Sequence, residues 1–228
     1  MPLNIGFVLF PNVTQLDFTG PLQVLHRVPD SKVHILAKTR DTVMSDCGLG
    51  LMPTATFAQS PQLDVVCIPG GYGVSGAIAD EATIAFVRQQ GAAARYVTSV
   101  CTGAFVLGVA GLLKGRRATT HWAYTGLLPL VGATHEKARV VRDGNVLTGG
   151  GVTAGIDFAL TLAAEIAGPE AAQRIQLSIE YDPAPPFTSG SPEGAPQTVR
   201  DGTNERFATR LATFRGELQR ALLRKAPA

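Results

Sequence analysis

The sequence has few cysteines, little net charge and no long apolar run. Its three cysteines, Cys47, Cys67 and Cys101, are odd in number and widely spaced, which argues against a disulfide framework and against a paired-cysteine zinc site. No run of about 18 apolar residues occurs, so no membrane span is expected. The apolar start of the chain lacks the basic residues of a signal peptide and predicts a strand, so we expect a cytoplasmic protein with reduced cysteines.

Charge is equally sparse, since 17% of the 228 residues are charged and the net charge is +2. Residues 200–228 hold seven basic and three acidic residues (+4), so residues 1–199, with 13 basic and 15 acidic residues, carry −2. A field this weak favours neither nucleic acid nor an anionic membrane as a partner. Apolar residues make up 45% of the chain, which is enough for a sizeable core and excludes extended disorder.

Predicted strands alternate with predicted helices, a pattern typical of a mainly parallel sheet with helices on both faces. Apolar runs predict buried strands at residues 5–10, 32–37, 63–68 and 96–100. Helices are predicted at residues 15–28, 81–94, 102–113, 154–167 and 169–181, and hairpins within residues 41–57 and at residues 140–147. We therefore expect one α/β domain over residues 1–182.

The remaining residues, 183–228, predict a proline-rich loop followed by an amphipathic helix. Its apolar residues have a helical 4-3-4-3 spacing: Phe207, Leu211, Phe214, Leu218 and Ala221. We expect this stripe to pack on the same domain or on a dimer partner, with the arginines facing solvent. Packing of this kind, rather than binding of nucleic acid, is the interpretation that the pattern favours, and we expect a homodimer.

Cys101 is the strongest candidate for chemistry, because it lies where the predicted strand at 96–100 runs directly into a helix. A sharp turn of this kind is a nucleophile elbow, and Gly103 and Ala104 are small enough to allow it. The N-terminus of the following helix would lower the pKa of the thiol and favour a thiolate. The alternative is a small buried residue without chemistry. Cys47 and Cys67 are expected to be inert packing residues.

Three further features follow other predicted strands, at the edge of a parallel sheet where ligands bind. Asp17 follows the first strand and is interpreted either as a catalytic acid or base or as a residue that caps a helix. The glycines at 70, 71 and 73 surround Tyr72, and Gly149 to Gly151 precede a helix. Backbone N–H groups in such segments can stabilise developing negative charge, although turn formation alone also explains the glycines.

The sequence has neither a Walker loop nor a dinucleotide-binding glycine motif, and no cluster indicates a metal, so no cofactor is expected. His121 and Trp122 follow Thr120, which is a candidate cap for the next helix. They are interpreted either as the start of that helix or as pocket residues, with His121 as a possible partner of the cysteine.

These motifs resemble those of the superfamily that contains the PfpI-type proteases and the ThiJ-like proteins, over roughly residues 3–182. The resemblance rests on PGG at residues 69–71, SVCTG at 99–103 and GLLKGRRATTHW at 111–122. It implies a flavodoxin-like α/β sandwich and a dimer. Residue 102 is threonine where protease-like members have histidine, and residue 17 is aspartate where many members have glutamate. These departures argue against peptidase or deglycase activity.

Two subgroups are most similar. The isocyanide hydratases resemble the chain in LDFTGPLQVL at 16–25, GGGVTAGIDFALTLAAE at 149–165 and YDPAPPF at 181–187. The sensory domains of AraC-type regulators also resemble it, but a single helix after residue 197 is too short for their helix-turn-helix region.

The resemblance implies hydration of an isocyanide to an N-substituted formamide through a covalent thioimidate on Cys101. Asp17 would transfer protons, and Thr102 would hydrogen-bond Asp17 or the substrate nitrogen. The N–H groups of Gly71, Gly150, Gly151 and Val152 are the candidate donors to developing charge, and Tyr72, His121 and Trp122 are the candidate pocket residues. A redox or ligand sensor, or a hydrolase of small amides or α-oxoaldehydes, is the alternative.

Overall fold

A seven-stranded sheet forms the centre of the protein in the computed structural model, which describes residues 2–224. The strand order is β10-β11-β7-β6-β1-β2-β5. The strands are β1 (Leu3–Val8), β2 (Ser31–Ala37), β5 (Ala55–Thr56), β6 (Val65–Ile68), β7 (Tyr96–Val100), β10 (Val140–Asp143) and β11 (Val146–Gly149). Every neighbouring pair is parallel except β10 and β11.

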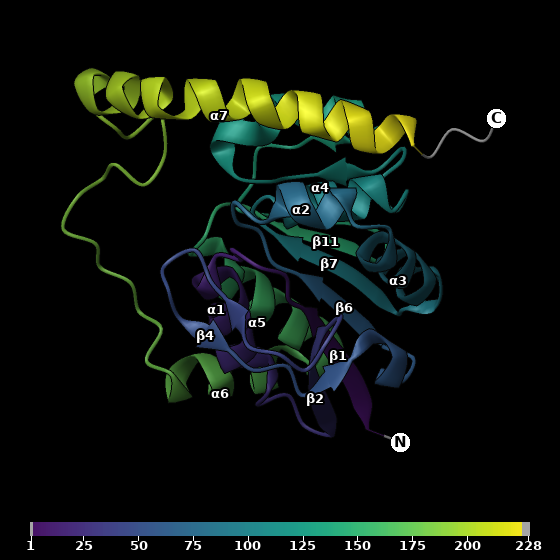
Figure 1. Cartoon of the computed structure of the whole chain (residues 1–228). Helices are drawn as coiled ribbons and strands as arrows, with labels where there is room; N and C mark the ends of the chain where they lie inside the picture. The colour runs from purple at the N-terminus through teal and green to yellow at the C-terminus, as the bar shows by residue number, and fades with distance from the viewer. Residues whose placement is uncertain (1, 225–228) are drawn as a thin grey trace.

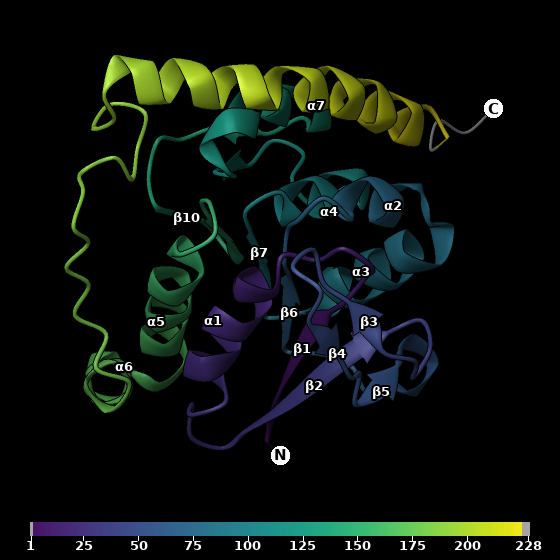
Figure 2. The ribbon, with the colours of Figure 1, turned by 60° about the vertical axis from the view of Figure 1, so that its left-hand side comes forward.

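The inner five strands, β2-β1-β6-β7-β11, have the 2-1-3-4-5 order of flavodoxin-like sheets. Helices α1 (Gln15–Leu25) and α5 (Ala154–Ala167) pack against each other, and α2 (Val74–Ala79), α3 (Glu81–Ala93) and α4 (Gly103–Val109) form a second group. Figure 2 shows the two groups on opposite sides of the sheet. The predicted α/β fold is therefore confirmed.

The strands form where the sequence is apolar on both faces, because helices cover both sides of the sheet. All four residues of β6 and all five of β7 are buried. Local signals set the helix ends: Asp80 accepts the N–H of Thr83 at 3.0 Å at the start of α3, and Pro169 begins α6 (Pro169–Ser178), where its missing N–H costs nothing.

Both predicted hairpins are present, as β3 (Val43–Met44) with β4 (Gly50–Leu51) and as β10 with β11. The predicted helix at 102–113 is wrong in length, because α4 ends at Val109 and Gly111 then takes a φ of +83°. The short helix α2 was not expected, nor were η1 (Phe57–Gln59), the 3-10 segment η2 (Trp122–Val131) and the paired strands β8 (Arg117–Ala118) and β9 (Thr134–His135).

The C-terminal helix α7 (Gln197–Leu223) lies along one end of the molecule, above α2 and α4 in Figure 1. The preceding loop rises beside the body from α6 at the opposite end. Phe214 and Leu218 are buried against the chain's own body, and the Phe214 ring lies 5.2 Å from that of Phe105 in α4. The apolar stripe therefore needs no second subunit to cover it, which removes one reason to expect a dimer. Residues 225–228 of the predicted C-terminal segment lie outside the described residues.

Candidate active site

Cys101 occupies the turn between β7 and α4 with a φ of +56°, a left-handed conformation that is unusual for a non-glycine residue. Its N–H donates to the carbonyl oxygens of Gly149, at 3.1 Å, and Gly150, at 2.9 Å. Its own carbonyl accepts the Thr120 hydroxyl at 2.7 Å. The surrounding backbone thus fixes the cysteine in this turn, at the carboxyl end of a central strand.

Asp17 lies in the first turn of α1 and is 1% exposed. Its Oδ2 accepts the N–H of Gly70 at 2.9 Å, whereas its Oδ1 is buried without a hydrogen-bond partner among residues 2–224. The capping interpretation is wrong, because the carboxylate binds the turn after β6 rather than an N–H of its own helix. The N-cap of α1 is Thr14, which makes no side-chain cap bond.

Burial raises the pKa of Asp17 to about 7, because the low-dielectric surroundings disfavour the charged carboxylate. The Gly70 N–H and a contact with Cys101 oppose this rise in pKa, and the nearby charge of Asp46 adds to it. Asp17 therefore exchanges protons near neutral pH, a property that suits an acid or base in catalysis.

The pKa of the Cys101 thiol is raised well above its usual range, by burial and then by the neighbouring Asp17 carboxylate. Hydrogen bonds from Thr102 oppose this rise in pKa without overcoming it. Burial and the neighbouring acid therefore oppose the thiolate that the sequence predicts. The helix that follows Cys101, α4, has only seven residues.

Gly70 and Gly71, in the turn after β6, both donate their N–H groups to side chains of the protein. The Gly71 N–H donates to Thr102 Oγ1 at 3.0 Å, so the prediction of Gly71 as a free donor is wrong. Thr102 has no hydrogen bond to Asp17 among the described residues, and its hydroxyl instead lies 3.4 Å from the Gly71 carbonyl. The sequence interpretation missed Gly70, whose N–H holds Asp17.

The segment after β11 offers two of its three predicted donors. The Gly150 N–H donates to the Arg139 carbonyl at 2.9 Å, so Gly150 is not available for a substrate. The N–H groups of Gly151 and Val152 have no acceptor within residues 2–224. These two groups remain candidates for stabilising developing charge.

The predicted pocket residues lie in two places. His121 precedes η2 and caps it, because its Nδ1 accepts the Ala123 N–H at 3.3 Å, so the helix cap is His121 and not Thr120. The His121 ring lies 5.6 Å from that of Trp122, and burial lowers the pKa of His121. No hydrogen bond joins His121 to Cys101 among the described residues. Tyr72 is 56% exposed and lies beyond the turn at Gly71.

The structure adds aromatic residues that the sequence interpretation missed. Tyr124 and, from α7, Phe207 complete a cluster with His121 and Trp122. The side chain of Arg210, also from α7, donates to the Tyr72 carbonyl at 3.2 Å. Phe207 and Arg210 gave no signal as site residues, because the pattern of the C-terminal segment only predicted an amphipathic helix.

The other two cysteines differ from each other. Cys67 is buried, and burial raises the pKa of its thiol to about 12, consistent with the predicted packing role. Cys47 is exposed, so the prediction that it packs in the interior is wrong. Its Sγ lies 3.4 Å from Ser45 Oγ in the turn between β3 and β4.

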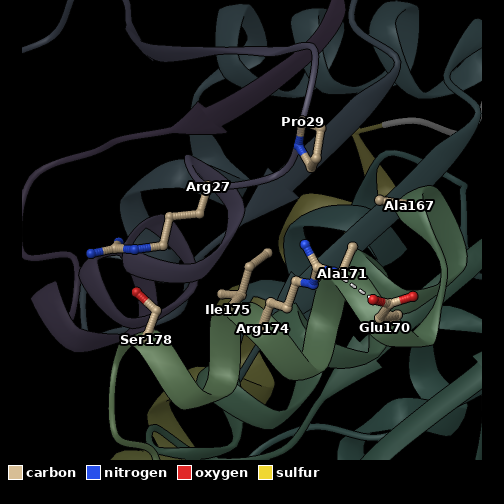
Figure 3. A pocket seen from close by; sticks show the side chains of 8 residues that line it. All are labelled: Arg27, Pro29, Ala167, Glu170, Ala171, Arg174, Ile175 and Ser178. Carbon is tan, nitrogen blue, oxygen red and sulfur yellow. Dashed lines mark hydrogen bonds and ion pairs between the residues drawn. The ribbon is translucent and has the colours of Figure 1, made fainter.

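Two large surface hollows are lined by residues other than Cys101. One, of about 600 Å³, lies between the end of α1 and α6. Arg174 pairs there with Glu170 at 2.6 Å, and Arg27 lies on the facing side (Figure 3). Another, of about 720 Å³, lies between Tyr72 and the β3–β4 hairpin. Within residues 2–224 no three His, Cys, Asp or Glu side chains gather as a metal site, and no helix has the length and apolar character needed to cross a membrane.

A flavodoxin-order sheet with a cysteine held at positive φ beside a buried carboxyl defines a doubly wound α/β protein with a candidate cysteine site. The DJ-1/PfpI family model matches residues 4–165, and the chain belongs to this family. The predicted membership is thereby confirmed.

Individual relatives agree with this assignment. The chain is 60% identical over 211 residues to an isonitrile hydratase of Pseudomonas putida, a match that covers 92% of each chain. It is similar to a crystal structure of a THiJ/PfpI family protein from Pseudomonas syringae, with a TM-score of 0.92, 42% identity, and coverage of 97% of this chain and 91% of that one. It is also 28% identical to the HTH-type transcriptional regulator GbdR of Pseudomonas aeruginosa, over 79% of this chain but only 51% of the regulator.

Titration of Asp17 predicts how stability depends on pH. Folding raises the pKa of Asp17 from 3.8 to about 7, so it favours the protonated acid. The associated stability is present below about pH 4 and is lost as pH rises to about 7, by up to roughly 4 kcal/mol. Asp17→Asn cannot ionise, so we expect it to gain stability relative to the wild type over this range.

Urea unfolding at a series of pH values between 4 and 8 measures this difference. Asp182→Asn, at an exposed carboxylate, is the matched control and should follow the wild-type curve. Parallel curves for the wild type and Asp17→Asn would show that Asp17 is not buried as an acid.

Proposed function

We propose that the chain is an isocyanide hydratase, which converts R–N≡C and water into R–NH–CHO. The observation that carries this proposal is the buried Asp17 carboxyl next to Cys101 in a chain that is 60% identical, nearly end to end, to an isonitrile hydratase. Isonitrile and isocyanide are two names for the same functional group. A soft sulfur nucleophile suits the terminal carbon of this group, which is electrophilic.

The first half of the reaction forms a covalent bond. Burial and Asp17 raise the pKa of the Cys101 thiol, so in this proposal the Asp17 carboxylate takes the thiol proton as the sulfur attacks the terminal carbon. Asp17 then gives this proton to the same carbon, which yields the thioimidate R–N=CH–S–Cys101. A pKa of about 7 suits Asp17 for both transfers, because neither protonation state is strongly favoured at neutral pH.

The second half uses water. Asp17 removes a proton from a water molecule as the oxygen adds to the thioimidate carbon, and the nitrogen receives that proton. The hydroxyl proton then passes to the sulfur as the C–S bond breaks, which releases R–NH–CHO and restores the Cys101 thiol. Splitting one addition into two steps is the usual advantage of nucleophilic catalysis.

The backbone donors have separate roles in this proposal. The Gly151 and Val152 N–H groups, which are free of protein acceptors in residues 2–224, would stabilise negative charge on the substrate. Thr102 would act on the sulfur, because the hydrogen bonds from Thr102 favour the thiolate form of Cys101. Gly71 fixes Thr102 through its N–H and has no direct role.

The burial of Cys101 favours this function over a redox sensor. Sensor cysteines are accessible and have a low thiol pKa, whereas Cys101 is buried and has a raised one. A thiol that is activated only when substrate and base are both in place fits an enzyme. Free thiols also fit the reducing cytoplasm, where we propose that the protein acts.

Substitution of Cys101 tests the covalent step. Cys101→Ala and Cys101→Ser should abolish the conversion of an isocyanide to its formamide, because neither side chain gives a soft thiolate. Formamide production without added cofactor is the measurement, and Cys47→Ser, at an exposed position, is the matched control with normal turnover.

Mass spectrometry of a slow variant should show one substrate mass added to Cys101. Retained hydration in Cys101→Ala would exclude the covalent mechanism.

Substitution of Asp17 tests the proton transfers. Asp17→Asn should lower turnover by about 10²–10⁴-fold, the usual contribution of a positioned acid or base. Asp17→Glu should lose on the order of 10²-fold, because the extra methylene displaces the carboxyl by roughly 1 Å. In the wild type, kcat/KM should rise with pH through about 7, as Asp17 becomes the carboxylate that accepts the thiol proton.

This pH step should be absent from the residual activity of Asp17→Asn. Normal turnover in a folded Asp17→Asn sample would exclude Asp17 as the base, and proton transfer would then require water or another side chain.

We also propose a homodimer, a prediction that now depends on the family resemblance alone. Light scattering at micromolar concentration should give about twice the chain mass of 23.9 kDa. Because the apolar stripe of α7 packs on its own chain, truncation at about residue 200 should expose the apolar surface that Phe214 and Leu218 cover. Truncation would therefore do more than separate two subunits. A mass of one chain for the full protein would exclude the dimer.

A further inference from the structure

Phe207 of α7 lies within a cluster of three aromatic side chains from η2 and the residue that caps it. Its ring centroid is 5.4 Å from that of His121, 5.7 Å from Trp122 and 6.1 Å from Tyr124. The contacts are tilted or edge-to-face, which are favourable geometries for aromatic pairs. Phe207, His121 and Trp122 are each only partly buried, so part of each ring is accessible at the edge of the cluster.

This aromatic cluster adjoins the turn that holds Cys101. The His121 ring lies against Gly151, where an added Cβ would be 2.6 Å from His121 Cδ2. Gly151 follows Gly150, whose carbonyl accepts the Cys101 N–H at 2.9 Å. On the other side, the Tyr124 ring lies 6.4 Å from that of Phe105 in α4. The rings therefore stand between α7 and the candidate catalytic turn.

A polar contact fixes α7 in this position. Arg210 donates to the Tyr72 carbonyl at 3.2 Å and to Ser75 Oγ at 2.5 Å, and Glu217 accepts a hydrogen bond from Ser75. The guanidinium also lies 5.9 Å from the centre of the Tyr72 ring and 5.7 Å from that of Phe214. Since Tyr72 directly follows Gly71, this contact joins α7 to the turn that contacts Thr102.

We propose that α7 supplies a specificity-determining wall of the substrate site, in which Phe207 contacts the substituent R of the isocyanide. This inference rests on the function proposed above. With the reacting carbon at Cys101, the proposal places the substituent on the Gly151 and His121 side, where the rings of Trp122 and Phe207 lie against that of His121. The Nδ1 of His121 is occupied by the Ala123 N–H, and the side chains of Phe207 and Trp122 offer mainly carbon surface. Bulky apolar substituents are therefore the class that this wall favours.

The test compares two substrates in the full-length protein. The ratio of kcat/KM for cyclohexyl isocyanide to that for methyl isocyanide should fall at least about tenfold in Phe207→Ala, because the larger group loses apolar contact. Phe207→Leu keeps apolar bulk without the ring and should give an intermediate ratio. Leu222→Ala is the matched control: it shortens a partly buried apolar side chain at the other end of α7 and should leave the ratio unchanged.

Trp122 provides a readout that does not require turnover, because it is the only tryptophan in the chain. Its fluorescence in Cys101→Ala should respond to N-cyclohexylformamide, and the added Phe207→Ala change should raise the dissociation constant at least about tenfold. A Phe207→Ala protein that remains folded and keeps both the wild-type ratio and the wild-type dissociation constant would overturn the inference. If the wild type hydrates neither isocyanide, the proposed function fails, and the fluorescence titration alone decides whether Phe207 binds apolar groups.

Discussion

The close approach of the turns after β6 and β7 is the constraint on which the candidate site depends. A Cβ at Gly103 would lie 2.2 Å from the Ile68 carbonyl oxygen, and one at Gly70 would lie 2.6 Å from the Thr102 nitrogen. Distances below 3.0 Å exclude a side chain at either position. Only because both residues are glycines can the Gly70 N–H reach Asp17 and the chain turn at Cys101 with a φ of +56°. The strained cysteine is thus held by its neighbours rather than by its own preference.

This close packing also sets the electrostatics of the site. A carboxyl with a single N–H donor is poorly compensated for the loss of water, so burial outweighs the Gly70 hydrogen bond and raises the pKa of Asp17 to about 7. The same enclosure, with the Asp17 carboxylate alongside, raises the pKa of the Cys101 thiol. Burial thus disfavours the charged form of both neighbouring groups, Asp17 and Cys101. The site is therefore suited to moving one proton between sulfur, carboxyl and substrate.

Sequence patterns located Asp17, the glycine turn and Cys101 because all three follow apolar strands, and a parallel sheet brings such strand ends to one edge. The sequence patterns did not reveal which backbone N–H groups are free or in which direction the pKa of Cys101 is shifted. Whether a backbone N–H is free depends on a partner elsewhere in the chain, as with Gly71 and Thr102 or Gly150 and Arg139. The pKa of Cys101 is shifted upward by burial, whereas a helix N-terminus lowers the pKa of a thiol. The local sequence does not show how deeply the sulfur is buried, so it could not decide between these two effects.

The residues proposed for bond making and those proposed for substrate specificity lie in different parts of the chain. The residues proposed for bond making, Asp17, Cys101 and Thr102, lie within the 4–165 segment that matches the family model, whereas Phe207 and Arg210 lie beyond it. A substitution at Phe207 would alter the proposed contact with the substituent and leave in place the contacts among β6, β7 and α1 that hold the glycine-packed turns, whereas a substitution at Arg210 would remove a hydrogen bond to Tyr72. When the reacting groups lie in the 4–165 segment and the substituent contacts a wall from α7, the range of substrates can vary while the geometry of proton transfer stays fixed.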